Sequence, residues 1–186
     1  MKLTFGRKIS YRPMLISVFI GLIIGWFLYL IAKSLVVGIL FGLISFIVVV
    51  GLYALNLTRS FGYWETTSTG IKYYDYGSAA KSFKAILMPF KVNQQQVDFT
   101  DVTAANLVVE NGYQIPEVVK AASASAYVIQ AVEKNYTSPY YLDLELKSGA
   151  EVPLDLSMNA KETKQIKQVL ETISSKTHTE IGLIQR

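Results

Sequence analysis

The chain has 186 residues, 51% of them hydrophobic, and a formal net charge of +4. The charge is unevenly distributed: residues 1–59 hold six Lys or Arg and no Asp or Glu, while residues 60–186 hold twelve against fourteen, a net −2. Because nucleic-acid binding requires a concentrated basic face on a folded domain, this distribution argues against it. The absence of cysteine excludes disulfides, thiol catalysis and Cys-ligated metals.

Two apolar runs, residues 14–32 and 35–57, contain no Asp, Glu, Lys, Arg or His. Each has about 19 to 23 residues, which at about 1.5 Å per residue matches the hydrocarbon core of a bilayer, roughly 30 Å. A helix buried in a soluble protein would carry polar residues on its outer face. We therefore predict that residues 1–58 form a basic N-terminus and a transmembrane hairpin that turns at Lys33-Ser34.

The flanking charges predict the topology, because positive residues near the ends of spans are retained in the cytoplasm. The turn offers only Lys33. The basic residues that precede the first span are Lys2, Arg7, Lys8 and Arg12, and those that follow the second are Arg59, Lys72, Lys81, Lys84 and Lys91. We expect a multi-pass protein of the plasma membrane with both termini in the cytoplasm. A cleavable signal peptide is the alternative, but the first run is too long for its apolar region and no small-x-small cleavage site precedes a polar mature chain.

Small residues recur at four-residue spacing on one face of each predicted span. The predicted helix-packing residues are Ser17, Gly21, Gly25, Ser34, Gly38 and Gly42. Small side chains let helix backbones approach closely, so these residues either close the hairpin or join two copies of the chain. Neither span holds an ionisable group that would form an ion pathway.

Residues 59–186 predict a cytoplasmic α+β domain. Short strand-like runs separated by turns lie at residues 62–67, 71–76, 95–100, 106–110, 126–132, 140–147 and 150–156. In residues 140–147 polar and apolar side chains alternate, which predicts one face in water. A helix is expected at about 159–176, with Ile166, Val169, Leu170 and Ile173 on its apolar side. His178 lies beyond it, in a tail predicted to fray.

The domain resembles the bacterial pleckstrin-homology-like (bPH) domains that follow a two-span hairpin in small Gram-positive membrane proteins. The motifs that carry the resemblance are W-E-T-T-S-T-G-I-K-Y-Y (64–74), V-D-F-T-D-V-T (97–103) and L-K-S-G-A-E-V-P-L (146–154). Residues 76–95 are longer and more apolar than a strand connection, and residues 117–125 suggest a helix or loop. The resemblance implies an antiparallel β-barrel or sheet closed by a C-terminal helix, which binds protein or lipid without catalysis.

Residues 79–91 mix three lysines with aromatic and aliphatic side chains, a composition suited to lipid headgroups. The candidate lipid-surface residues are Arg7, Lys8, Arg12, Arg59, Lys81, Phe83, Lys84, Phe90 and Lys91. The alternative is that residues 79–91 cover the open end of the barrel and that their lysines are solvated.

No pattern in the sequence predicts catalysis, a cofactor or a metal. The single histidine leaves no triad or histidine-based metal site, and the phosphate-binding glycine motifs are missing. Asp98, Asp101 and Glu110 lack the spacing of a calcium loop, so we expect them to be solvated. The predicted function is a non-catalytic adaptor or assembly factor that binds a protein partner at the inner membrane surface. The alternatives are a homo-oligomeric pore and a module that binds or senses anionic lipid.

Overall fold

The computed structural model describes residues 2–92, 94–110, 112 and 138–185, except for the side chains of Thr58 and Arg59. The predicted segments 117–125 and 126–132 lie outside the described residues. The chain divides into two compact units. The sheet unit holds Met1–Lys8, Thr58–Tyr74 and Gln94–Arg186, and the hairpin unit holds Ile9–Leu57 and Asp75–Asn93. The predicted α+β class is confirmed, with two long apolar helices followed by sheets.

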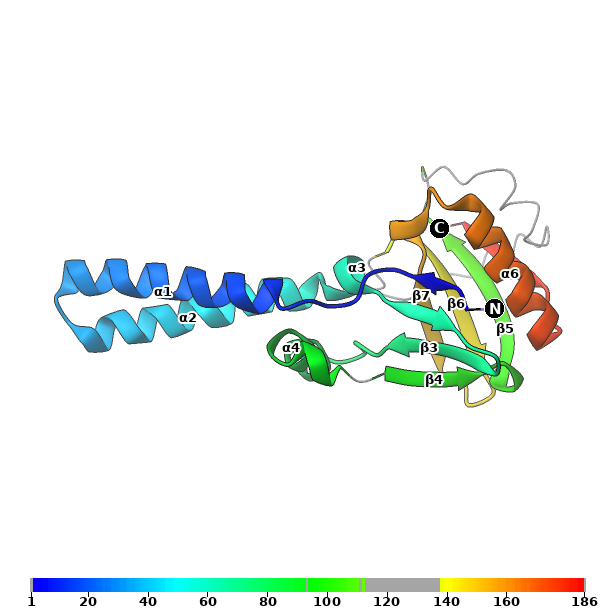
Figure 1. Cartoon of the computed structure of the whole chain (residues 1–186), viewed down its shortest axis with the longest axis horizontal. Coiled ribbons are helices and arrows are strands. Elements are labelled where there is room, and N and C mark those ends of the chain that lie inside the picture. Colours follow the sequence, from blue (N-terminus) through cyan, green and yellow to red (C-terminus); the bar gives the residue numbers. More distant parts are fainter. Residues whose placement is uncertain (1, 93, 111, 113–137, 186) are drawn as a thin grey trace. The chain divides into compact units, whose positions relative to one another are not determined.

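The hairpin unit contains α1 (Arg12–Ala32) and α2 (Leu35–Leu55), which lie antiparallel (Figure 1). Lys33 ends α1 in the left-handed conformation, with φ of 48°, and its N–H donates to the Tyr29 carbonyl over 2.8 Å. The second helix ends two residues earlier than the predicted span. Asn56 follows it and donates its side-chain amide to the Leu52 carbonyl, and a short helix, α3 (Leu57–Phe61), comes next.

The first sheet joins residues from both sides of the hairpin in sequence. It consists of β1 (Thr4–Phe5), β2 (Trp64–Thr66), β3 (Gly70–Tyr74) and β4 (Gln94–Asp98), all antiparallel and in that order. In the register, Phe5 lies opposite Trp64, and their rings stack with centroids 4.4 Å apart. The sequence had not predicted β1.

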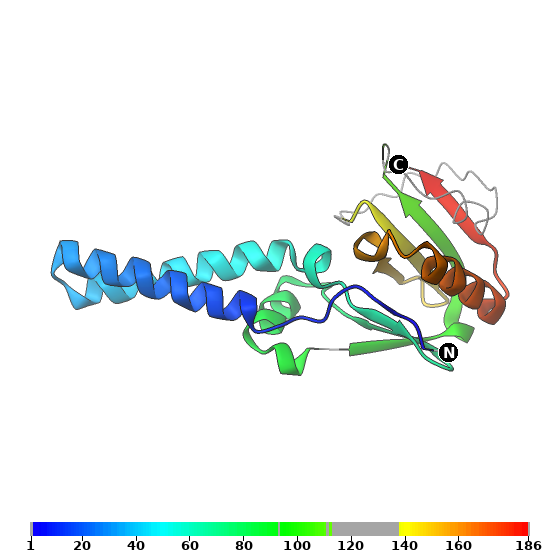
Figure 2. The ribbon, with the colours of Figure 1, turned by 45° about the horizontal axis from the view of Figure 1, so that its top comes forward.

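The second sheet is mixed. It consists of β5 (Val102–Val109), β6 (Tyr140–Leu146), β7 (Glu151–Asp155) and β8 (Ile181–Gln185), in the order β7-β6-β5-β8. Figure 2 shows β8 beside β5, to which it pairs in parallel. The prediction of a frayed tail was therefore wrong. His178 ends the preceding helix with φ of 57°, and the chain then returns to the sheet.

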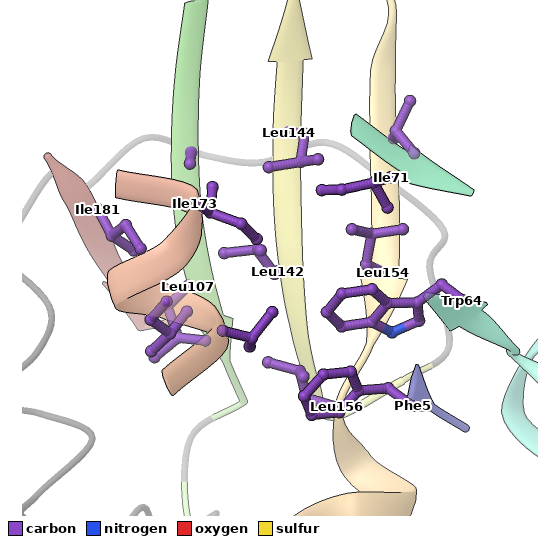
Figure 3. Close-up of a cluster of buried hydrophobic side chains, with 14 of the residues drawn as sticks. Phe5, Trp64, Ile71, Leu107, Leu142, Leu144, Leu154, Leu156, Ile173 and Ile181 are labelled. Carbon is purple, nitrogen blue, oxygen red and sulfur yellow. The ribbon is translucent and has the colours of Figure 1, made fainter. Parts of the chain in front are cut away.

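The core of the sheet unit takes side chains from both sheets and from α6 (Thr163–Thr177) (Figure 3). The helix begins later than predicted because residues 157–159 form a separate 3-10 turn. Its four predicted core residues, Ile166, Val169, Leu170 and Ile173, are all fully buried. The described strands form two open sheets and not a closed barrel, and a strand follows the helix.

The predicted wet face of β6 was also wrong in part. Tyr141 is 1% exposed and Asp143 is 6% exposed, so both are buried. Tyr141 belongs to a second, smaller cluster with Val108 of β5 and Ile184 of β8. The alternating pattern identified the strand correctly but not the environment of its polar face.

Candidate membrane interface

The seam between α1 and α2 is built on glycine because the two backbones approach closely there. A Cβ atom on Gly25 would lie 2.8 Å from the Gly38 carbonyl oxygen, and one on Gly42 would lie 3.0 Å from that of Gly21. Ser17 is fully buried and donates its hydroxyl to the Pro13 carbonyl over 2.8 Å. Ser34 instead occupies the turn, as the residue that precedes α2.

The faces of α1 and α2 that point away from the seam carry exposed apolar side chains. Phe27 is 60% exposed and Val36 is 76% exposed. Water contact with so much contiguous apolar surface is unfavourable, and surfaces of this kind mark contact with a membrane or another protein. By length and composition, both helices could cross a membrane.

An open apolar groove of about 720 Å³ runs along one face of this hairpin. Gly21, Gly25, Gly38 and Gly42 are among its lining residues, and Trp26 also lines it. Because glycines carry no side chains, the groove reaches the helix backbones. The seam thus serves intramolecular packing and also leaves an open apolar surface.

A short amphipathic helix packs against α2. The helix α4 (Ala79–Leu87) begins after Ser78, whose hydroxyl accepts from the Lys81 N–H over 3.3 Å. Ile86 and Ala85 are buried, and a Cβ atom on Gly51 of α2 would lie 3.8 Å from the Phe83 ring. This face of α4 therefore lies against the end of α2 that is remote from the Lys33 turn, as Figure 1 shows.

The remaining surface of α4 and the following turn η1 (Pro89–Lys91) is exposed, and we call it the α4–η1 face. Its members are Lys84, Leu87, Met88, Phe90 and Lys91. Phe90 is 67% exposed, and the Lys91 ammonium lies 5.9 Å from the centroid of its ring. Lys84, Phe90 and Lys91 had been predicted as lipid-surface residues, whereas Leu87 and Met88 had not. The sequence feature that could have identified Leu87 and Met88 is the continuous apolar run that they form with Ile86.

Two other predicted lipid-surface residues of this segment have different roles. Lys81 forms an ion pair with Asp75, whose carboxylate also accepts from the Gly77 N–H over 2.8 Å. Phe83 packs near Gly51. Both residues fix α4 in place.

The basic residues that flank α1 and α2 are also divided in role. Arg7 and Arg12 are exposed. Lys8 is exposed too, and its ammonium lies 4.8 Å from the centroid of the Tyr63 ring, within the sheet unit. The side chain of Arg59 lies outside the described residues.

A polar cluster ties the N-terminal segment to β2. The Lys2 ammonium lies 3.1 Å from the Glu65 carboxylate, to which the Tyr63 hydroxyl donates a hydrogen bond. The Tyr63 hydrogen bond is the main cause that lowers the pKa of Glu65, and Lys2 adds to it. Burial, followed by the Glu65 hydrogen bond and charge, raises the pKa of Tyr63 well above its usual range.

Asp155 is a buried carboxylate, 1% exposed, at the end of β7. Its Oδ1 accepts from the Ser138 hydroxyl and from the hydroxyl and N–H of Ser157, at 2.8 Å and 3.2 Å. Burial raises its pKa despite these hydrogen bonds. The Trp64 indole N–H donates to the Asp155 carbonyl over 2.7 Å, so the residue links the two sheets.

Three acidic residues were considered for a cation site. Asp98, Asp101 and Glu110 are exposed, and Asp98 accepts from the Gln96 amide over 2.9 Å. Within the described ranges, no group of three or more His, Asp or Glu side chains is placed to hold a metal ion.

A search against protein-family models, curated proteins and solved structures finds no match to this chain. The bPH resemblance therefore remains a prediction, and functional inference depends on the geometry above.

Proposed function

We propose that the chain is a non-catalytic adaptor anchored in the plasma membrane by α1 and α2, with its sheet unit in the cytoplasm. The observation that carries this proposal is the pairing of β1, which precedes α1, with β2, which follows α2. Strands that pair in one sheet lie on the same side of a membrane, so the hairpin enters and leaves through one face. The positive-inside rule assigns the basic flanks, and hence that face, to the cytoplasm.

The same pairing argues against a cleaved signal peptide. Cleavage would remove β1, and with it Phe5, which is fully buried against Trp64. Loss of a large buried aromatic side chain costs about 3–5 kcal/mol. The N-terminal segment is thus part of the sheet unit.

The binding role draws support from β4. This strand pairs with β3 along one edge, and no described strand pairs with its other edge. Gln94, Gln95, Gln96 and Asp98 of β4 are exposed. An edge strand of this kind can accept an extended peptide of a partner protein as an added strand. Such strand addition is the binding mode that we propose.

The topology can be tested with single cysteines because the chain has none of its own. Lys33→Cys lies in the turn and Ser148→Cys in the β6–β7 turn, and both sites are exposed. A membrane-impermeant maleimide should label Lys33→Cys in intact cells and Ser148→Cys only after permeabilisation. Labelling of Ser148→Cys in intact cells, or labelling of Lys33→Cys only after permeabilisation, would overturn the proposed topology.

The adaptor role can be tested by photo-crosslinking from β4 in the native membrane. A photoreactive residue at Gln96 should capture one defined protein, and the same residue at Ser148 is the matched control. A partner captured from both sites equally, or no adduct at all, would contradict strand addition. An adduct only with a second copy of the chain would favour the homo-oligomeric alternative.

A further inference from the structure

The position of α4 along α2 sets its depth relative to the proposed spans. Phe83 packs near Gly51, which is four residues before the end of α2 and thus about 6 Å from it along the axis. A helix of 21 residues measures about 31 Å, close to the hydrocarbon thickness. With α1 and α2 in a bilayer, the packed face of α4 therefore meets α2 about 6 Å inside the hydrocarbon boundary, the depth to which interfacial amphipathic helices bury their apolar face.

The composition of the α4–η1 face suits this depth. Leu87, Met88 and Phe90 are 38%, 44% and 67% exposed, although each is apolar. Lys84 and Lys91 lie among them, whereas the positive charge of Lys81 is balanced by Asp75. Apolar side chains bordered by unbalanced lysines are typical of helices that lie in the interface of an anionic leaflet.

We propose that the α4–η1 face binds the headgroups of anionic phospholipids in the leaflet through which the hairpin enters. The apolar side chains enter the boundary between headgroups and acyl chains, and the ammonium groups of Lys84 and Lys91 pair with lipid phosphates. Covalent attachment to the spans keeps the face at the membrane, so weak contacts suffice. The proposal rests on the membrane anchoring inferred above and adds a lipid specificity to it.

The test uses the full chain with Met88→Cys carrying an environment-sensitive fluorophore, reconstituted in vesicles. One set of vesicles is phosphatidylcholine alone, and the other contains about one-quarter phosphatidylglycerol. Lipids with a nitroxide near the headgroup quench a probe that is docked. The same fluorophore on Ser148→Cys, in the β6–β7 turn, is the matched control.

We expect strong quenching at Met88→Cys in the anionic vesicles and weak quenching in phosphatidylcholine. Since a lysine near an anionic surface favours binding roughly five-fold, Lys84→Gln with Lys91→Gln should lower the ratio of docked to undocked probe by about 25-fold. Both residues are exposed, so these changes leave the fold intact.

Flotation of the protein with the vesicles reports the anchoring separately. Failure to float would contradict the membrane anchoring itself. If the protein floats but its Met88→Cys probe stays unquenched, the lipid-binding proposal is overturned. A protein partner would then be the candidate ligand of the α4–η1 face. Equal quenching in both lipid mixtures, or quenching that is unchanged by the lysine substitutions, would overturn the preference for anionic lipid.

Discussion

Substitution of Gly25 by alanine tests the packing of the hairpin. The added Cβ atom would lie 2.8 Å from the Gly38 carbonyl oxygen, whereas ordinary contacts begin at 3.4 Å, so the helices must separate by about 0.6 Å. A gap of this size forfeits a quarter to a half of the dispersion energy of the atoms that it separates. We expect Gly25→Ala to destabilise the hairpin by about 1–3 kcal/mol.

Gly51→Ala is the matched control for Gly25→Ala. It lies in α2 outside the glycine seam, and its Cβ atom would lie 3.8 Å from the nearest atom, an ordinary contact. Helix propensity favours alanine over glycine by about 1 kcal/mol, so this variant should be neutral or stabilised. The assay is titration of SDS into detergent micelles, followed through Trp26 fluorescence, with a Trp26→Phe variant to subtract the Trp64 signal. Equal midpoints for the two alanine variants would refute the reasoning.

Three further predictions concern the sheet unit, each read as a thermal midpoint of the full chain in micelles by near-UV circular dichroism. Phe5→Ala should cost about 3–5 kcal/mol, since it removes a fully buried ring stacked on Trp64, and an unchanged midpoint would show that β1 is dispensable. Because burial raises the pKa of Asp155, the wild type should lose stability as the pH rises from about 3.8 through that pKa. Asp155→Asn should remove this dependence, and an identical profile would contradict it. Because the pKa of Glu65 is lowered, its contribution is present above 4.5 and lost as the pH falls through the lowered pKa. Glu65→Gln should therefore lower the midpoint at neutral pH and not in strong acid, and the opposite pattern would contradict the Tyr63 and Lys2 contacts.

The helical hairpin could be predicted from the sequence because the pattern that indicates it lies within each helix and needs no distant partner. Apolar length and the absence of charge define the two long helices, and four-residue spacing puts Gly21 and Gly25 on one face of α1 and Gly38 and Gly42 on one face of α2. The amphipathic stripe of α6 was equally clear, since its apolar residues recur at helical spacing.

The elements that could not be predicted, β1 and β8, are stabilised by residues far away in the chain. A two-residue strand such as β1 has no periodicity, and its stabilising contact, Trp64, lies 59 residues further on, the difference between positions 64 and 5. The short run that forms β8 looks like a terminal tail until its parallel pairing with β5 is known. In the candidate interface, the sequence identified the lysines of residues 79–91 as candidates to face lipid. It did not show that Lys81 pairs with Asp75 and that Lys84 and Lys91 remain exposed.

The pairing of β1 with β2 has a consequence for biosynthesis. These neighbouring strands are joined by a loop that contains both apolar helices, so the first sheet stays incomplete until the whole hairpin has left the ribosome. Closing so long a flexible loop costs entropy, but a formed hairpin brings its own two ends together and reduces that cost. With α1 and α2 in a bilayer, as proposed, insertion of the hairpin would thus act as the assembly step for the first sheet. A fragment that starts at Arg59 therefore lacks β1, and with it the ring that stacks on Trp64.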